Sequence, residues 1–409
     1  MAVHPTQKIY FDDPYQIEFE ARVLDVIPRA GKWGVVLDRT CFYPESGGQP
    51  ADKGELAGVP VVDVTVEADQ IIHWLEEPCP RKQVTGKIDW PRRFDHMQQH
   101  AGQHILSQSF YELYQAETLS FHLGEEVSSV EIDVRQADGE LIRRVEARAN
   151  QIVFEDREIK TYFLPQEKIS QIPLRKPPKK AGLIRVVEVD GFDYSACGGT
   201  HPRRTGEVGL IKIIRWEKIR QNIRFEFVCG QRALKDYQLK NQIIRELIAR
   251  LNVKTEEIGQ AVDKLSQQLK LMRKKIKNMS QELSAFQAAE MMDRSKTHFV
   301  AEFFADRSPE EIKYLALGII KSGPYVVLFG TKVDGQIHLV MAASEELGLN
   351  LRDIQPVVIE IIQGKGGGSP SLLEFRGEKP EKFSLLQEEI EKYLAREKPE
   401  VLKEKISGD

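Results

Sequence analysis

The first 90 residues alternate apolar and polar positions in short runs. The alternation is clearest over residues 16–28, and shorter β-branched runs follow at 33–38, 59–67 and 70–76. A period of two residues is typical of half-buried strands, and glycines between the runs supply turns. The pattern predicts a small β-barrel or curled sheet, which we assign to residues 1–90.

Residues 40–54 interrupt this alternation. The stretch is rich in glycine and proline, so it predicts a loop rather than a strand interior. Such a loop is either a plain connection or a segment whose backbone amides approach a ligand.

Residues 91–229 mix helical and strand periods. Pro91 suits the first position of a helix, and the apolar positions that follow recur near helical spacing up to Phe110. A second amphipathic helix is predicted at 139–152, strands at 128–134, 181–190 and 208–228, and a polar, proline-rich loop at 160–178. This region therefore predicts a mixed α+β unit.

Residues 230–294 have a purely helical pattern, divided near 252–255. In the second segment, apolar residues from Ile258 to Phe286 recur at spacings of four and three, which is a heptad seam. The seam must bury against either the preceding helix, in a hairpin, or a second subunit. The pattern predicts a helical hairpin or coiled coil and leaves a homodimer through this region open.

Residues 295–409 predict a C-terminal α/β domain. Two β-branched runs flank Asp334-Gly335, a hairpin signal, and helices are predicted at 351–363 and from Lys382. Between them, residues 363–370 hold four glycines and one lysine, a composition that predicts neither helix nor strand. This segment is either a flexible connection or a loop that presents its amides and Lys365 to a phosphate.

Composition limits the classes of protein to consider. No run of eighteen apolar residues exists, and the N-terminus lacks the basic and apolar regions of a signal peptide. Four scattered cysteines fit a reducing compartment, so we expect no membrane association and a cytoplasmic location. The net charge of −4 argues against a globally basic nucleic-acid binder, but basic clusters at 175–180, 203–224 and 270–277 permit local phosphate contacts.

Two short stretches carry the metal-binding chemistry. His100 and His104 are four residues apart, which places both imidazoles on one face of a helix. Cys197 and His201 have the same spacing across two glycines, which allow a tight turn. Together the four residues form a Cys1His3 set, typical of zinc, and we predict one Zn²⁺ per chain.

Three motifs together resemble a known family. Residues 40–56, the HAGQH stretch at 100–104 and the CGGTH stretch at 197–201 resemble the editing domain of alanyl-tRNA synthetase and the free-standing AlaX trans-editing proteins. The helical segment and residues 364–368 resemble the C-terminal domain of that synthetase, which is related to a domain of DHH phosphoesterases. The chain therefore resembles the long form of AlaX.

The resemblance implies an aminoacyl-tRNA deacylase, a carboxylic ester hydrolase that acts in trans without ATP. Its expected partner is tRNA(Ala) carrying a wrong amino acid, with serine as the first candidate and glycine as the second. The resemblance does not include the adenylate-forming domain, so we do not expect tRNA charging. The alternatives are a non-catalytic, zinc-containing tRNA-binding protein and a phosphodiesterase. The latter is disfavoured because Asp95-His96-Met97 is the nearest approach to its Asp-His-His motif.

The resemblance also implies roles for individual residues. His122 is a candidate general base, although a structural histidine explains it equally well. The expected substrate-binding residues come from the first loop, the CGGTH stretch and the C-terminal glycine-rich segment: Gly47, Gly48, Gln49, Thr200, Lys365, Gly366 and Gly367. Two positions depart from the family pattern, since Ala101 replaces a threonine and Ser369 an arginine.

Overall fold

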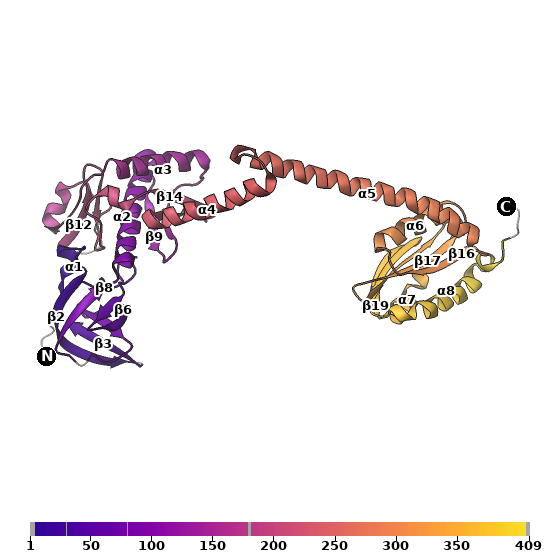
Figure 1. Cartoon of the computed structure of the whole chain (residues 1–409), viewed down its shortest axis with the longest axis horizontal. Helices are drawn as coiled ribbons and strands as arrows, with labels where there is room; N and C mark the ends of the chain where they lie inside the picture. Colours follow the sequence, from indigo (N-terminus) through magenta and orange to yellow (C-terminus); the bar gives the residue numbers. More distant parts are fainter. Residues whose placement is uncertain (1–4, 30, 80, 179–180, 406–409) are drawn as a thin grey trace. The chain divides into compact units, whose positions relative to one another are not determined.

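The computed structural model describes residues 5–29, 31–79, 81–178 and 181–405. The chain divides into two compact units, residues 1–247 and 248–409, each with its own mixture of helices and sheets (Figure 1). This arrangement confirms the predicted multidomain α+β class. None of the described helices is long and apolar enough to cross a membrane.

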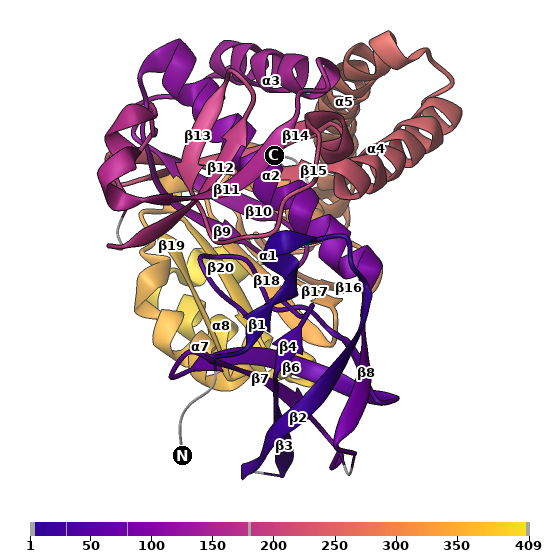
Figure 2. The same ribbon diagram turned by 90° about the vertical axis from the view of Figure 1, so that its left-hand side faces the viewer.

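The first unit begins with six strands that close into a barrel. Their order is β2-β3-β7-β6-β5-β8, and the barrel lies at the end of the unit opposite α3 (Figure 2). Inward-facing side chains such as Val35, Leu37 and Leu75 are fully buried, as the alternating pattern requires. The elements are β1 (Gln7–Lys8), α1 (Ile9–Asp12), β2 (Glu18–Arg29), β3 (Lys32–Leu37), β4 (Arg39–Thr40), β5 (Gly54–Leu56), β6 (Val59–Glu67), β7 (Gln70–Leu75) and β8 (Gln83–Ile88).

A long central helix, α2 (Trp90–Tyr114), follows the barrel. Asp89 caps it by accepting a hydrogen bond from the backbone N–H of Arg92, and Pro91 occupies the first turn, as predicted. The segment from Met97 to Ser107 is buried throughout, so α2 is an interior helix rather than a surface one. Its histidines are therefore held rigidly inside the protein.

Two antiparallel sheets and α3 (Gly139–Phe154) complete the α+β part of the first unit. The predicted loop at 160–178 is wrong in its first part, because Ile159–Pro165 pairs with β12 along its whole length. One sheet contains β9 (Thr118–Leu123), β10 (Ser128–Ile132), β14 (Ile211–Ile219) and β15 (Asn222–Cys229); the other contains β11 (Ile159–Pro165), β12 (Leu183–Val189) and β13 (Asp193–Ala196).

Two helices follow, α4 (Gly230–Leu251) and α5 (Ile258–Arg294). The heptad seam of α5 is exposed: its side chains from Val262 to Phe286 retain between 48% and 79% of their accessible surface. The hairpin, the coiled coil and the dimer that this seam predicts all stay predictions.

The second unit contains a five-stranded sheet in the order β16-β17-β18-β20-β19. The predicted hairpin at Asp334-Gly335 is confirmed, since Val333 on β17 pairs with Gln336 on β18. Helix α6 packs on one face, and α7 and α8 belong to the core of the other. The elements are β16 (Phe299–Phe304), α6 (Pro309–Lys321), β17 (Val326–Val333), β18 (Gln336–Ala343), α7 (Gln355–Ile362), β19 (Gly364–Ser369), β20 (Leu372–Gly377) and α8 (Phe383–Glu397).

The glycine-rich segment predicted to be a loop is in fact a strand, β19, at the edge of this sheet. A Cβ atom added at Gly364, Gly366 or Gly368 would lie 2.1–2.4 Å from a backbone carbonyl oxygen of β20. The glycines therefore permit a close approach between two backbones, which composition alone did not reveal. Lys365 lies on this strand opposite Arg376.

Candidate metal centre

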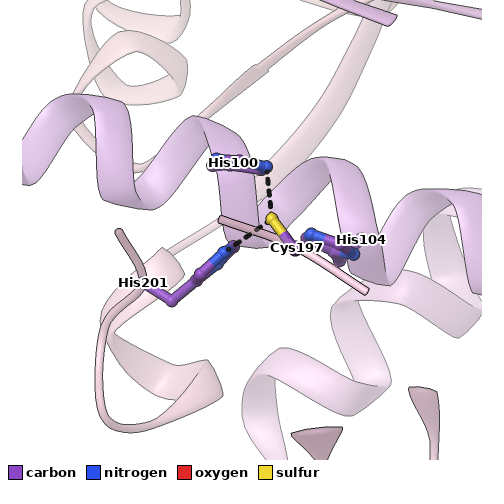
Figure 3. Close-up of side chains that lie close together, drawn as sticks. All are labelled: His100, His104, Cys197 and His201. Atoms are coloured by element: carbon purple, nitrogen blue, oxygen red, sulfur yellow. Dashed lines mark hydrogen bonds between the residues drawn. The ribbon is translucent and has the colours of Figure 1, made fainter. Parts of the chain in front are cut away.

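The four predicted metal ligands converge on one point (Figure 3). His100 and His104 lie one turn apart on α2, and Cys197 and His201 come from the segment that follows β13. One ligand atom from each of the four residues lies within 4.8 Å of all the others. The sulfur of Cys197 is 3.3 Å from Nε2 of His100 and 3.4 Å from Nε2 of His201.

The protonation chemistry of the cluster suits a metal ion. Burial opposes ionisation of Cys197, but the neighbouring His100 and His201 lower the pKa of its thiol well below the usual value. Thiolate is the form that binds zinc. Burial, reinforced by the charge of His100, lowers the pKa of His201 to about 3, so its imidazole is neutral near pH 7.

His104 contributes a nitrogen that lacks a protein partner. Its Nε2 is fully buried and makes no hydrogen bond, whereas its Nδ1 lies 3.3 Å from Oδ2 of Asp193. Nearly all buried polar groups have a partner, so an orphaned imidazole nitrogen beside a thiolate fits a metal ligand. Burial favours the neutral ring, but the carboxylate of Asp193 and the thiolate of Cys197 nearby raise the pKa of His104 to about 9.

Gln49, from the glycine-rich loop, fixes the orientation of His100. Its Oε1 accepts the backbone N–H of Thr200 at 3.1 Å, so the same oxygen also accepts from Nδ1 of His100, 2.8 Å away. The Nε2 of Gln49 donates to the hydroxyl of Thr200 at 2.8 Å. Nδ1 of His100 therefore donates to Gln49 and Nε2 points toward Cys197, which is the arrangement of a supported metal ligand.

Arg185 holds the turn that carries Cys197. Its Nη1 donates to the carbonyl oxygens of Cys197 at 3.0 Å and Gly199 at 2.8 Å. The side chain is buried, its guanidinium lies 4.8 Å from the ring of Phe11, and its Nε and Nη2 have no hydrogen-bond partner among the described residues. Arg185 is thus a buried cation near the Cys197 thiolate, and it forms no ion pair with a carboxylate of the described residues.

The glycines of the CGGTH turn serve close packing. A Cβ atom at Gly199 would lie 2.2 Å from Cε1 of His100 and 2.8 Å from Oε1 of Gln49. Only glycine allows the turn to approach the helix so closely.

Gly48 and Phe121 flank the cluster from the other side. The carbonyl of Gly48 accepts the N–H of Leu123 at 3.3 Å, which joins the glycine-rich loop to β9. The ring of Phe121 lies 5.8 Å from that of His100, so Phe121 faces the ligands. The alternation of a strand turns His122 to the opposite side, where it is exposed. The structure thus does not bring His122 to the cluster, and its role as a base stays a prediction.

A buried ion pair secures the loop against α2. Both carboxylate oxygens of Asp52 accept hydrogen bonds from Arg93 on α2, and neither side chain is exposed. Arg93 also donates to the carbonyl of Cys41 at 2.6 Å. This pair positions the segment that carries Gly47, Gly48 and Gln49.

Sequence reasoning missed the residues that support the ligands. Asp193 lies on β13 and Arg185 on β12. The sequence signal for Arg185 was a single arginine inside the apolar run 183–189, which indicates a buried cation. The other predicted substrate-binding residues, Lys365, Gly366 and Gly367, lie on β19 of the second unit.

Comparison with known proteins gives two family matches. Residues 184–225 match the family described as "Threonyl and Alanyl tRNA synthetase second additional domain". Residues 15–92 match the family described as "tRNA synthetases class II (A)". The first match covers the Cys197–His201 segment, and the second covers the barrel and the glycine-rich loop.

Whole-chain relatives extend this likeness. The chain is 29% identical over 408 residues to an alanyl-tRNA editing protein, AlaX-L, of Pyrococcus horikoshii. The matched region covers 95% of this chain and 99% of that protein. It is 32% identical over 396 residues to an alanine–tRNA ligase of Pyrococcus abyssi, covering 91% of this chain but only 42% of the ligase. Among solved structures, the C-Ala domain of Aquifex aeolicus alanyl-tRNA synthetase is 24% identical and covers 24% of this chain and 90% of that domain, with a TM-score of 0.23.

Proposed function

The chain resembles the long-form AlaX proteins over nearly its whole length, and from this premise we propose that it hydrolyses wrongly aminoacylated tRNA(Ala) in trans. The substrate we propose is Ser-tRNA(Ala), with Gly-tRNA(Ala) as the second. The observation that carries the proposal is the buried convergence of His100, His104, Cys197 and His201 beside the glycine-rich loop. The protein would then be an aminoacyl-tRNA deacylase.

Such an enzyme has a clear chemical purpose. A binding pocket discriminates between side chains that differ by one small group by only about 10–200-fold. Serine adds one hydroxyl to alanine, and glycine lacks one methyl group. A second, hydrolytic site corrects the errors that the first site accepts.

The residues of the cluster would hold one zinc ion. Three imidazoles and one thiolate match the donor set that zinc prefers, and the orphaned Nε2 of His104 fits a ligand. Bound zinc would lower the pKa of a nearby water or polarise the ester carbonyl.

The protein residues around that centre have separable tasks. Gln49 keeps the proton of His100 on Nδ1, and Asp193 holds the corresponding nitrogen of His104. Phe121 and Gly48 place an apolar ring and a backbone carbonyl beside the ligands. These groups would orient the aminoacyl end of the tRNA. They would also exclude water from the site, apart from the one molecule that attacks the ester carbonyl.

A second candidate function rests on the same four ligands. Four protein ligands usually close a zinc site and make it structural, whereas hydrolytic zinc keeps one position open. The alternative is therefore a tRNA-binding protein with a structural zinc ion and no hydrolysis.

The second unit would contribute tRNA binding. Lys365, between Gly364 and Gly366 on the edge strand β19, is exposed and lies opposite Arg376, so two cations are adjacent on one surface. Like charges placed opposite each other are unfavourable unless an anion lies near them. The exposed heptad seam of α5 would join two copies of the chain in a homodimer.

The test is an assay with three substrates: Ser-tRNA(Ala), Gly-tRNA(Ala) and Ala-tRNA(Ala). We expect rapid ester loss from the first, slower loss from the second and none above background from the third. Binding without ester loss would favour the structural alternative. Equal hydrolysis of the alanyl ester would remove the claim of selectivity.

A further inference from the structure

A groove of about 700 Å³ lies in the first unit, away from the metal ligands. Its walls are formed by the end of α2 at Tyr114, by the segment leading into α3 and by the last residues of the strand β14. Strand β14 is the edge strand of its sheet, so this side of the groove is open. Nothing in the proposed hydrolytic site accounts for the groove.

Three cations line the groove without a carboxylate partner. Arg135, Arg144 and Lys218 are exposed and form no ion pair within the described parts of the chain. Two of the acidic groups in the lining are already engaged. Asp138 accepts the backbone N–H groups of Glu140 and Leu141 as the cap of α3.

The second of these acidic groups is Glu217, which lies 3.7 Å from Arg215 and 3.6 Å from Arg224. Its charge is therefore matched by two arginines beside the groove. Glu140 is the third carboxylate of the lining, which holds three carboxylates and three cations. Arg215 and Arg224, beside Glu217, raise the number of cations to five. The excess of positive charge suits a ligand with negative charges.

Two aromatic rings accompany the cations. Trp216, on the edge strand β14, is 41% exposed although it lies opposite the fully buried Phe225. The guanidinium of Arg144 lies 5.5 Å from the ring of Tyr114. Trp216 is the exposed ring, whereas Tyr114 is half-buried against the core. An exposed ring among unpaired cations combines the features that bind nucleic-acid bases and phosphates.

The groove and the metal ligands are connected by one rigid helix. Tyr114 follows His104 by ten residues on α2, which corresponds to about 15 Å along the helix axis. Successive nucleotides of an RNA strand lie a few ångströms apart, so the interval corresponds to only a few nucleotides. A single RNA could therefore occupy both places.

We propose that this groove binds the tRNA whose 3′ end enters the metal centre, a few nucleotides from the ester, through phosphate contacts and base stacking. This proposal rests on the proposed function, because it assumes a tRNA substrate. Arg135, Arg144 and Lys218 contact phosphates, and Trp216 stacks on an unpaired base or on the end of a duplex. The groove thereby sets the distance of the acceptor end from the ligands.

The experiment measures binding of uncharged tRNA(Ala) to the full-length, metal-loaded protein over a range of salt concentrations. In the variant with Arg135→Gln, Arg144→Gln and Lys218→Gln, we expect the slope of log affinity against log salt to fall by roughly 2–3. Trp216→Ala should weaken binding by about tenfold, and Trp216→Phe should restore most of it, because phenylalanine still stacks. Circular dichroism confirms that each variant folds.

Matched controls remove the same number of charges elsewhere. The barrel variant carries Lys32→Gln on β3, Arg39→Gln on the neighbouring β4 and Lys82→Gln next to β8, and Tyr237→Ala removes a 62% exposed ring from α4. These variants should retain the affinity and salt slope of the original chain. An unchanged slope in the groove variant, or an equal fall in the barrel variant, overturns the proposal.

Hydrolysis separates this proposal from the proposed function. If Ser-tRNA(Ala) is hydrolysed, the groove variants should raise KM and leave kcat within about twofold at saturating tRNA. A loss of kcat with unchanged KM would contradict the groove as a binding site. If no mischarged tRNA is hydrolysed but the groove variants still lose tRNA binding, the proposed function fails and the groove proposal survives.

Discussion

Oε1 of Gln49 lies 2.8 Å from Nδ1 of His100, so a side chain from the glycine-rich loop holds a proton on one nitrogen of a candidate metal ligand. The same oxygen accepts the N–H of Thr200, which lies between Cys197 and His201 in the second pair. One amide therefore joins three segments that are far apart in sequence. The positions of His100 and of the glycine-rich loop are therefore coupled through this side chain.

Replacing this amide should weaken metal binding without unfolding the chain. We expect Gln49→Ala to lower zinc affinity about 10–100-fold, as loss of such supporting groups typically does. Competition against a chromogenic chelator measures the affinity, and Gln151→Ala, at an exposed position on α3, is the control. Equal affinities of the two variants would show that Gln49 does not support His100.

Arg185 should stabilise the ligand turn. Arg185→Met leaves the buried carbonyls of Cys197 and Gly199 without a side-chain donor, at a cost of about 1–3 kcal/mol in the free energy of unfolding. Urea unfolding measures this cost, and zinc affinity should fall in parallel because the turn loosens. Arg215→Met, which removes an exposed arginine, is the control. An unchanged zinc affinity would mean that the turn holds its shape without Arg185.

Gly48 should be more sensitive to a methyl group than its neighbour. Both Gly47 and Gly48 have positive φ angles, of 56° and 82°, so either alanine variant carries backbone strain of roughly 1–2 kcal/mol. Only at Gly48 does the new Cβ meet another group, the ring of Phe121 at 2.8 Å. We therefore expect Gly48→Ala to displace that ring and slow hydrolysis by about a hundredfold.

Gly47→Ala is the matched comparison, since nothing lies within 4 Å of its added Cβ. Initial rates on Ser-tRNA(Ala) give the comparison directly. Similar rates for the two variants would exclude a role for the contact between Gly48 and Phe121.

The buried pair of Asp52 and Arg93 should dominate the stability of the loop. Asp52→Asn leaves a fully buried guanidinium without its counter-charge, which typically costs about 3–5 kcal/mol. Glu67→Gln breaks the exposed pair with Arg29 and should leave the unfolding midpoint unchanged. Thermal unfolding of both variants tests the contrast, and a small effect of Asp52→Asn would show that the loop is anchored elsewhere.

The ligand set could be predicted because its spacing is local. His100 and His104 share a helical face, and two glycines between Cys197 and His201 imply a turn. Within each pair, the spacing along the chain is therefore enough to predict that the two side chains lie close together. The α+β class and the helix that begins near Pro91 followed from hydrophobic periods in the same way, but the burial of that helix on all sides did not.

The supporting residues and β19 could not be predicted because they depend on tertiary contacts. Asp193 and Arg185 act through partners on other elements, and nothing in their own surroundings along the chain specifies those partners. The glycines from Gly364 to Gly368 had the composition of a loop, but the neighbouring strand β20 makes them a strand. His122 shows the limit of motif reasoning, since one step along β9 separates it from Phe121, which faces the ligands.

The most direct test removes zinc from the intact protein and restores it while hydrolysis of Ser-tRNA(Ala) is measured. We predict one zinc per chain, loss of ester hydrolysis when it is removed, and recovery that saturates as one equivalent returns. The Cys197→Ser variant should neither retain zinc nor hydrolyse the ester. Full hydrolysis by a folded, zinc-free protein would contradict a zinc-dependent deacylase.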